Sequence, residues 1–300
     1  MPREKKKIGW DYGLVVIVLI LAVIGLLILY STSTYNGQVK FQDPYYYLKK
    51  QAFATVLGLA AMFFAAKIDY HVWKPFAPAA YLIAIGLSTA VLFIGEEYNG
   101  SKRWLSFGPF SFQPSEYAKI AVILFLACLV TKNIKKIGKL RTLFKVVAAV
   151  LPIVALVGTN NLSTAIIILG IAVVLVFVAS PKYAQFFWLG GLCAGFMGVF
   201  LALESYRLER LEIWRNPEKF EKGYQTLQGL YAIGSGGLFG KGIGGSIQKL
   251  GFVPEAQNDM IFSIICEELG LIGASFIICL FLVLIWRFFV IATHAKDLFG

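Results

Sequence analysis

The sequence predicts an all-α fold, a polytopic bundle of helices embedded in a membrane, and composition and hydropathy both indicate it. Apolar residues make up 58% of the 300-residue chain, and the mean hydropathy is +0.72. Soluble domains contain about 45–50% apolar residues. Apolar runs of about 18 residues, the length that an α-helix needs to cross a bilayer, recur along the chain. The alternating segments of about ten residues that are typical of membrane β-barrels are absent from the sequence.

We expect eight spans in a single domain covering residues 1–300. They are 13–30, 51–68, 76–95, 114–131, 143–158, 162–180, 183–203 and 260–288. The fifth is the shortest and begins beside Lys145, whose long side chain can reach the membrane surface. No small-x-small cleavage site follows the first span, so we expect it to be retained rather than removed as a signal peptide.

The distribution of Lys and Arg predicts the topology. The short loops that would face outward contain only Lys40, Lys49, Lys50, Lys102 and Arg103, and the short inner segments contain many more. This bias places the N-terminus in the cytoplasm. The net charge of +11 is then a consequence of topology rather than a sign of nucleic-acid binding.

One large polar loop, residues 204–259, separates the last two expected spans and would be extracytoplasmic. Its basic and acidic residues balance, and it is rich in glycine from Gly223 to Gly245. Glycine allows close backbone approach, so a phosphate-cradling loop is one interpretation, although the Walker and dinucleotide spacings are not met. A flexible or re-entrant loop is the other.

Asp259 is the sharpest candidate for chemistry, because it places a carboxylate where this loop meets the last span. At that place a base could act on a polar substrate anchored in the lipid. The structural alternative is a helix N-cap, which an Asp before an apolar run commonly forms and which stabilises by about 1 kcal/mol. The two roles are compatible.

A second candidate group opens the fourth span. Pro114 fits a first helical turn, and Glu116 in that turn is favoured by the helix dipole. Lys119 is three residues on, so one interpretation is a structural ion pair with Glu116. The other is functional, because a charge one turn inside a span usually faces a cavity or a partner. Arg103 and Lys119 could together hold a phosphate or pyrophosphate.

Glu267 and Glu268 lie eight and nine residues beyond Asp259 in the sequence, about 12–13 Å deeper in the last span. Unpaired carboxylates there would each cost several kcal/mol. We expect buried, hydrogen-bonded carboxyls that hold helices together, with a proton or ion path as the alternative.

The remaining reactive side chains suggest no metal centre. Cys128, Cys193, Cys266 and Cys279 all lie in apolar segments, so we expect core cysteines without a disulfide framework. The two histidines, His71 and His294, are isolated in the sequence, and no ligand spacing for a structural metal exists.

An ordered set of motifs resembles the SEDS family (shape, elongation, division and sporulation proteins, the FtsW/RodA/SpoVE group). The resemblance spans nearly the whole chain, with features closer to FtsW and SpoVE than to RodA. The motifs are Asn99-Gly100-x-x-Arg103-Trp104, Phe112-Gln113-Pro114-Ser115-Glu116-x-x-Lys119, Gly223-Tyr224-Gln225, Ala232–Gly236, Pro254-Glu255-Ala256, Asp259 and Glu267-Glu268-Leu269-Gly270.

The resemblance implies a peptidoglycan glycosyltransferase of the bacterial cell membrane, serving division, elongation or sporulation. It would polymerise lipid II, using a polyprenyl-pyrophosphate glycan as donor, alongside a class B penicillin-binding protein. Asp259 matches the family's essential carboxylate. Arg103, Glu116 and Lys119, with Gln113 and Ser115 of the same motifs, match polar substrate-binding positions. A divalent cation, Mg²⁺ or Mn²⁺, is an open option, with no dedicated ligand cage in the sequence.

Two other classes of function stay open. A lipid II flippase would fit the buried carboxyls and the break at Asn160-Asn161. A non-catalytic membrane scaffold for the penicillin-binding protein would use the same loop and helix faces.

This sequence departs from the family pattern in three places. Gln257-Asn258 replaces the common His-Thr before Asp259, and Asn161 replaces an Asp that opens the sixth span. The family has ten spans, so the chain is expected to lack the final two and to be short at its C-terminal end.

Overall fold

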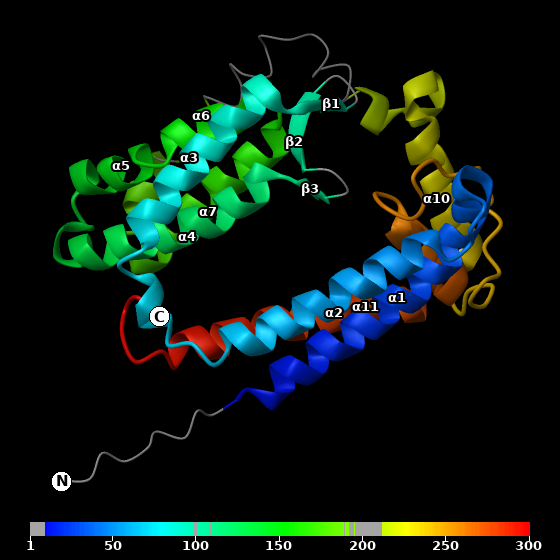
Figure 1. Cartoon of the computed structure of the whole chain (residues 1–300), viewed down its shortest axis with the longest axis horizontal. Coiled ribbons are helices and arrows are strands. Elements are labelled where there is room, and N and C mark those ends of the chain that lie inside the picture. The colour runs from blue at the N-terminus through cyan, green and yellow to red at the C-terminus, as the bar shows by residue number, and fades with distance from the viewer. Residues whose placement is uncertain (1–9, 99–100, 108–109, 189, 192–194, 196–211) are drawn as a thin grey trace. The chain divides into compact units, whose positions relative to one another are not determined.

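The computed structural model describes residues 10–98, 101–107, 110–188, 190–191, 195 and 212–300 (Figure 1). These residues form two compact units. Unit 1 contains the described residues of Met1–Lys67 and Val199–His294, and unit 2 those of Ile68–Gly198 and Ala295–Gly300. Asp259 therefore belongs to unit 1, whereas Arg103, Glu116 and Lys119 belong to unit 2.

Unit 1 is built on long helices. Its elements are α1 (Tyr12–Phe41), α2 (Tyr46–Ala65), the short 3-10 helices η3 (Pro217–Lys219) and η4 (Glu221–Gly223), α10 (Tyr224–Gly236) and α11 (Ile261–Thr293). Helix α1 packs against α2 and α11, and α10 packs against α11. An apolar core between α1 and α11 includes Ile28, Ile265 and Ile277.

Unit 2 combines helices with a small sheet. Its elements are η1 (Tyr70–Trp73), α3 (Ala77–Ile94), β1 (Glu96–Tyr98), β2 (Ser101–Phe107), β3 (Phe110–Phe112), α4 (Pro114–Asn133), η2 (Ile134–Lys136), α5 (Leu140–Ala148), α6 (Leu151–Gly158) and α7 (Leu162–Ala179). Its core contains apolar side chains of α3, α4, α5, α6 and α7, such as Tyr81, Leu126, Leu143, Ile153 and Ile168.

The helical membrane fold class is confirmed. Among the described residues, six helices are long and apolar enough to cross a membrane, namely α1, α2, α3, α4 with η2, α7 and α11. The bent pair α5 and α6 brings the number to seven if it is one span. This pair occupies the short fifth span, and Pro152 in the first turn of α6 lacks the N–H that would continue a straight helix. The expected seventh span, 183–203, lies mostly outside the described residues, as does Cys193.

The three-stranded antiparallel sheet, in the order β1-β2-β3, is an addition to the expected all-α fold. Strand β2 pairs with both neighbours, and Arg103 lies within it. Such short strands depend on pairing with residues distant along the chain rather than on local propensity, so the sequence gives a weak signal for them.

Helix α1 continues well past the apolar run that predicted it, ending at Phe41 instead of near residue 30. The polar stretch after the run stays helical because Ser31, Thr32 and Ser33 are buried in the packing of the unit. Its C-cap, Gln42, adopts a left-handed conformation with φ of 56°.

Helix α11 is broken at Gly270, where φ is 66° and ψ is −170°. The glycine-rich segment after α10 fills this break with four backbone hydrogen bonds. The N–H groups of Lys241 and Gly242 donate to the carbonyls of Glu267 and Glu268, each at 2.9 Å, and those of Leu271 and Ile272 donate to the carbonyls of Gly237 and Leu238, at 2.9 and 3.1 Å. The glycines thus serve a structural purpose, because they bring the loop into main-chain contact with α11.

Glycine is required where α10 meets α11. A Cβ on Gly236 would lie 1.9 Å from the carbonyl oxygen of Cys266, and one on Gly240, where φ is +77°, would lie 2.2 Å from that of Glu268. Real Cβ atoms do not approach the backbone this closely. The segment that contains Gly236 and Gly240 can therefore contact α11 only because glycine has no side chain.

His71 is not isolated, contrary to the sequence analysis. Its ring nitrogens contact the carboxylates of Asp69 and Asp297. These hydrogen bonds, that of Asp69 first, raise the pKa of His71 above its usual value. The pKa of Asp297 is lowered by backbone N–H donors from Gly300 and Phe299 and by His71.

We predict that Gly236→Ala destabilises the protein by about 1–3 kcal/mol, because the added methyl group must push two backbones apart. Gly234→Ala in the same helix is the matched control, since a Cβ there meets nothing within 4 Å. Thermal unfolding in detergent should separate the two. Equal melting temperatures for the two variants would contradict the close contact.

We predict that the His71 contact with Asp297 is strongest between the lowered pKa of Asp297 and the raised pKa of His71. At pH values below the usual histidine pKa, His71 is protonated and the contact has its full strength. The contact weakens as the pH rises through the raised pKa of His71. An NMR titration of the ring should show an elevated pKa, lowered more by Asp69→Asn than by Asp297→Asn. An unchanged ring pKa in both variants would reject the contact.

Candidate functional site

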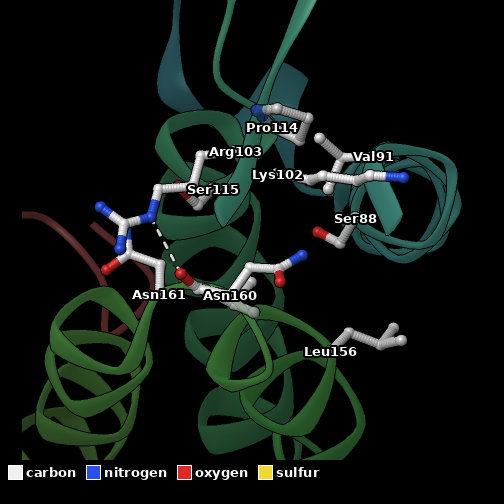
Figure 2. Close-up of a pocket in the computed structure, with 10 residues that line it drawn as sticks. Ser88, Val91, Lys102, Arg103, Pro114, Ser115, Leu156, Asn160 and Asn161 are labelled. Carbon is white, nitrogen blue, oxygen red and sulfur yellow. Dashed lines mark hydrogen bonds between the residues drawn. The ribbon is translucent and has the colours of Figure 1, made fainter. Parts of the chain in front are cut away.

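The predicted cationic group lies in unit 2, where β2, α4 and the junction of α6 with α7 meet (Figure 2). Arg103 is exposed on β2, and its Nε donates a hydrogen bond of 2.9 Å to the carbonyl oxygen of Asn160. Asn161 is the N-cap of α7, and its side chain accepts from the N–H of Thr164 at 3.1 Å. The expected break at Asn160-Asn161 is therefore a capped helix start that Arg103 contacts.

A small cavity adjoins Arg103. Its lining residues are Ser88, Val91, Lys102, Arg103, Pro114, Ser115, Leu156, Val157, Asn160 and Asn161. Its volume is about 20 Å³, which is room for about one water molecule. The hydroxyl of Ser115 is buried and has no hydrogen-bond partner among the described residues. A pyrophosphate would therefore have to bind on the exposed side of Arg103 rather than inside this cavity.

The start of α4 has the predicted architecture. Gln113 is its extended N-cap, without a side-chain cap bond, and Pro114 begins the helix. Lys119 Nζ lies 2.9 Å from Glu116 Oε2, so the predicted ion pair is present. Glu116 is more exposed than Lys119, with side-chain exposed fractions of 57% and 27%. Both charges are thus accessible to a ligand at the helix N-terminus.

Asp259 lies at the end of the loop in unit 1, and its side chain is exposed. The N-cap of α11 is Met260, and no side chain caps the helix, so the N-cap interpretation of Asp259 is wrong. The helix begins two residues after Asp259 because residues 250–260 form a series of turns. The structure gives the Asp259 carboxylate no hydrogen bond or ion pair with any described residue.

The turn before Asp259 is held from three directions. Glu255 adopts a left-handed conformation with φ of 51°, and its Oε2 accepts from the amides of Asn258 and Gln257, at 2.7 and 3.3 Å. Asn36 of α1 donates to the side-chain oxygen of Gln257 at 2.7 Å. Lys40 lies 3.8 Å from Glu255. Gln257 and Asn258, which depart from the common family pattern, therefore fix the loop through their amides.

Glu267 and Glu268 are both fully buried and receive their partners from the loop. Lys241 Nζ lies 2.7 Å from Glu267 Oε1, and Ser246 donates to Glu267 Oε2 at 2.5 Å. Lys249 Nζ lies 2.7 Å from Glu268 Oε1.

Ser31 of α1 completes the second of these groups, because its hydroxyl donates to Glu268 Oε1 at 2.6 Å and accepts from Lys249 at 2.8 Å. Neither lysine was predicted as a partner from the sequence, because the basic and acidic residues of the loop balance and indicated only solvent-exposed charges. The only signal in the sequence was that the two lysines lie eight residues apart, one on each side of a run of glycines.

Metal-ligating side chains do not cluster in the part of the chain that the structure describes. No group of three or more His, Cys, Asp or Glu residues there could hold an ion.

The comparison with protein families agrees with the motifs on the two units. The model described as "Cell cycle protein", which represents FtsW, RodA and SpoVE, matches residues 12–300. The chain belongs to this family.

Curated relatives match it over most of their length. Stage V sporulation protein E of Bacillus subtilis (strain 168) is 39% identical over 303 residues, covering 98% of this chain and 82% of that protein. The probable peptidoglycan glycosyltransferase FtsW of Thioalkalivibrio sulfidiphilus is 37% identical over 302 residues, covering 97% and 75%.

Solved structures of family members share the fold. A chain from a peptidoglycan synthase complex that coordinates polymerization and crosslinking superposes with a TM-score of 0.77 at 27% identity, covering 97% of this chain and 80% of that chain. The rod shape determining protein RodA of Thermus thermophilus gives a TM-score of 0.66 at 26% identity, covering 99% and 79%.

We predict that Lys249→Met destabilises the protein by about 3–5 kcal/mol, because it leaves the Glu268 carboxylate buried without its counter-charge. Removing both charges, in Lys249→Met with Glu268→Met, should recover much of this loss. Thermal unfolding is the measurement.

Lys40→Met is the control for this prediction, because it breaks the exposed pair with Glu255 and should change stability by less than about 0.5 kcal/mol. A double variant no more stable than Lys249→Met alone would contradict a coupled buried pair.

Proposed function

We propose that this chain is a peptidoglycan glycosyltransferase that polymerises lipid II into glycan strands. Its family membership supports the proposal, as does its similarity to relatives named as probable peptidoglycan glycosyltransferases. The structural observation that carries it is Asp259, an exposed carboxylate without a partner among the described residues, held at the loop-to-helix junction by a braced turn.

In the proposed reaction, Asp259 accepts the proton of the 4-hydroxyl of the lipid II acceptor. The hydroxyl oxygen then forms a bond to the anomeric carbon of the donor glycan, and the bond from that carbon to the pyrophosphate oxygen breaks. The pyrophosphate leaves on its polyprenyl carrier. Arg103 and Lys119 stabilise the negative charge that develops on it.

The Glu116 carboxylate positions the Lys119 side chain in this scheme. Paired with Glu116 at 2.9 Å, Lys119 is held in place near the positive end of the α4 dipole. A pyrophosphate can compete for it, because Lys119 is a point charge with three donors. Gln113 and Ser115, on either side of Pro114, supply neutral polar groups at the same helix start.

The proposed setting is the bacterial cell membrane with the N-terminus in the cytoplasm, which places the 204–259 loop outside. The positive-inside distribution of Lys and Arg supports this orientation. The proposed partner is a class B penicillin-binding protein, since a similar chain occurs in a peptidoglycan synthase complex.

We predict that Asp259→Asn lowers the rate of glycan polymerisation from purified lipid II by about 10²–10⁴-fold, the typical contribution of a general base. The protein should keep its melting temperature, because the carboxylate has no structural partner among the described residues. Glu218→Gln, another exposed carboxylate of the same loop, should retain full activity. Wild-type activity in Asp259→Asn would reject the base.

A further inference from the structure

A second, larger cavity lies within unit 1, between the C-terminal half of α1 and the 204–259 loop. Its volume is about 560 Å³, within the range of about 300–1,000 Å³ that small-molecule sites occupy. It is lined by Tyr30, Ser31, Thr34, Tyr35, Gln38, Pro44, Ile243, Gly244, Lys249 and Leu250. None of these residues has a role in the mechanism above.

Neutral hydrogen-bonding groups form one wall. Ser31, Thr34, Tyr35 and Gln38 follow a spacing of three to four residues, so they share one face of α1. Thr34 donates its hydroxyl proton to the carbonyl of Tyr30 at 2.5 Å, which leaves its oxygen as an acceptor. The Tyr35 hydroxyl and the Gln38 amide can each donate and accept.

The lining of the cavity as a whole carries no net charge, because its one described charged residue is paired. Lys249 is the one charged side chain among the lining residues that the structure describes, and it is 7% exposed. Glu268 neutralises it at 2.7 Å, and its contacts with Glu268 and Ser31 account for two of its three N–H donors. A phosphate or pyrophosphate would have to displace this buried pair, so the cavity suits an uncharged ligand.

Apolar surface completes the site. Pro44, Ile243 and Leu250 contribute aliphatic groups, and Tyr30 and Tyr35 contribute aromatic rings. Tyrosine combines an apolar ring with a polar end. A sugar ring offers the matching surfaces, C–H groups on its faces and hydroxyl groups around its edge.

We propose that this cavity is a saccharide subsite that binds an uncharged sugar unit of the lipid-linked glycan. The inference rests on the proposed function, and it adds a second place where the substrate is held, away from its pyrophosphate.

Helix α1 connects the subsite to the turn before Asp259. Asn36, adjacent to Tyr35, holds Gln257 two residues before Asp259. Gly251, with φ of +100°, brings the loop against the Tyr35 ring, so closely that a Cβ would lie 3.2 Å from it. A sugar bound beside Tyr35 would therefore contact the elements that position Asp259.

The test measures binding rather than turnover. The full-length chain in phosphatidylcholine nanodiscs is titrated with a soluble β-1,4-linked trimer of N-acetylglucosamine, followed by saturation-transfer NMR. Thr34→Trp fills the cavity and should weaken binding at least about tenfold. Val39→Trp, on an exposed position of the same helix outside the lining, should bind like the wild type. Inorganic pyrophosphate should not displace the sugar.

Two further variants keep the test decisive if Thr34→Trp fails to fold. Tyr35→Phe and Gln38→Ala each remove one polar group and should each weaken binding several-fold; unchanged binding in both would overturn the subsite. Displacement of the sugar by pyrophosphate would overturn its neutral character.

The Asp259→Asn protein separates this inference from the proposed function. It should bind the trimer like the wild type even though it does not polymerise lipid II. Activity in Asp259→Asn would reject the base and leave the subsite standing. Wild-type sugar binding in a folded Thr34→Trp protein would reject the subsite and leave the enzyme standing.

Discussion

The break in α11 at Gly270 is the constraint on which unit 1 depends. A helix inside a membrane must satisfy its backbone polar groups within the protein, because the hydrocarbon offers no water. The segment 237–242 does so, donating to the carbonyls of Glu267 and Glu268 and accepting from the N–H groups of Leu271 and Ile272. The loop is thereby attached to the membrane helix by main-chain bonds, and its glycines are what allow that approach.

The two buried carboxylates reinforce this attachment with charge. Glu267 pairs with Lys241 and Glu268 with Lys249, so each carboxylate of the helix meets an ammonium of the loop. Buried ion pairs contribute little net stability, but breaking one is costly, so they favour a single arrangement over alternatives. The result is a loop with a fixed path that ends at the exposed Asp259.

Hydropathy was sufficient to predict the long helices, because crossing a bilayer needs a length of apolar sequence that few other structures need. The 13–30 run correctly marked α1 but not its end, since the polar residues that follow are buried by packing against neighbours distant in sequence. The sheet containing Arg103, helix α10 and the lysine partners of Glu267 and Glu268 all depend on such distant contacts. The alternative interpretation of Asp259 as the N-cap of α11 was wrong, because the turn centred on Glu255 delays the start of the helix. Its catalytic role, and its meeting with Arg103 and Lys119, stay predictions.

Helix α1 is much longer than the apolar run that it contains. Its 30 residues form a rod of about 45 Å, whereas the hydrocarbon layer is about 30 Å thick. At one end Asp11 is fastened to Arg287 of α11, at 2.5 Å, and at the other Asn36 and Lys40 touch the turn before Asp259. The apolar run at residues 13–30 accounts for only about 27 Å of this length, so the polar remainder extends beyond the hydrocarbon layer. The polar end of α1 thereby ties the turn before Asp259 to the same helix whose other end is paired with Arg287.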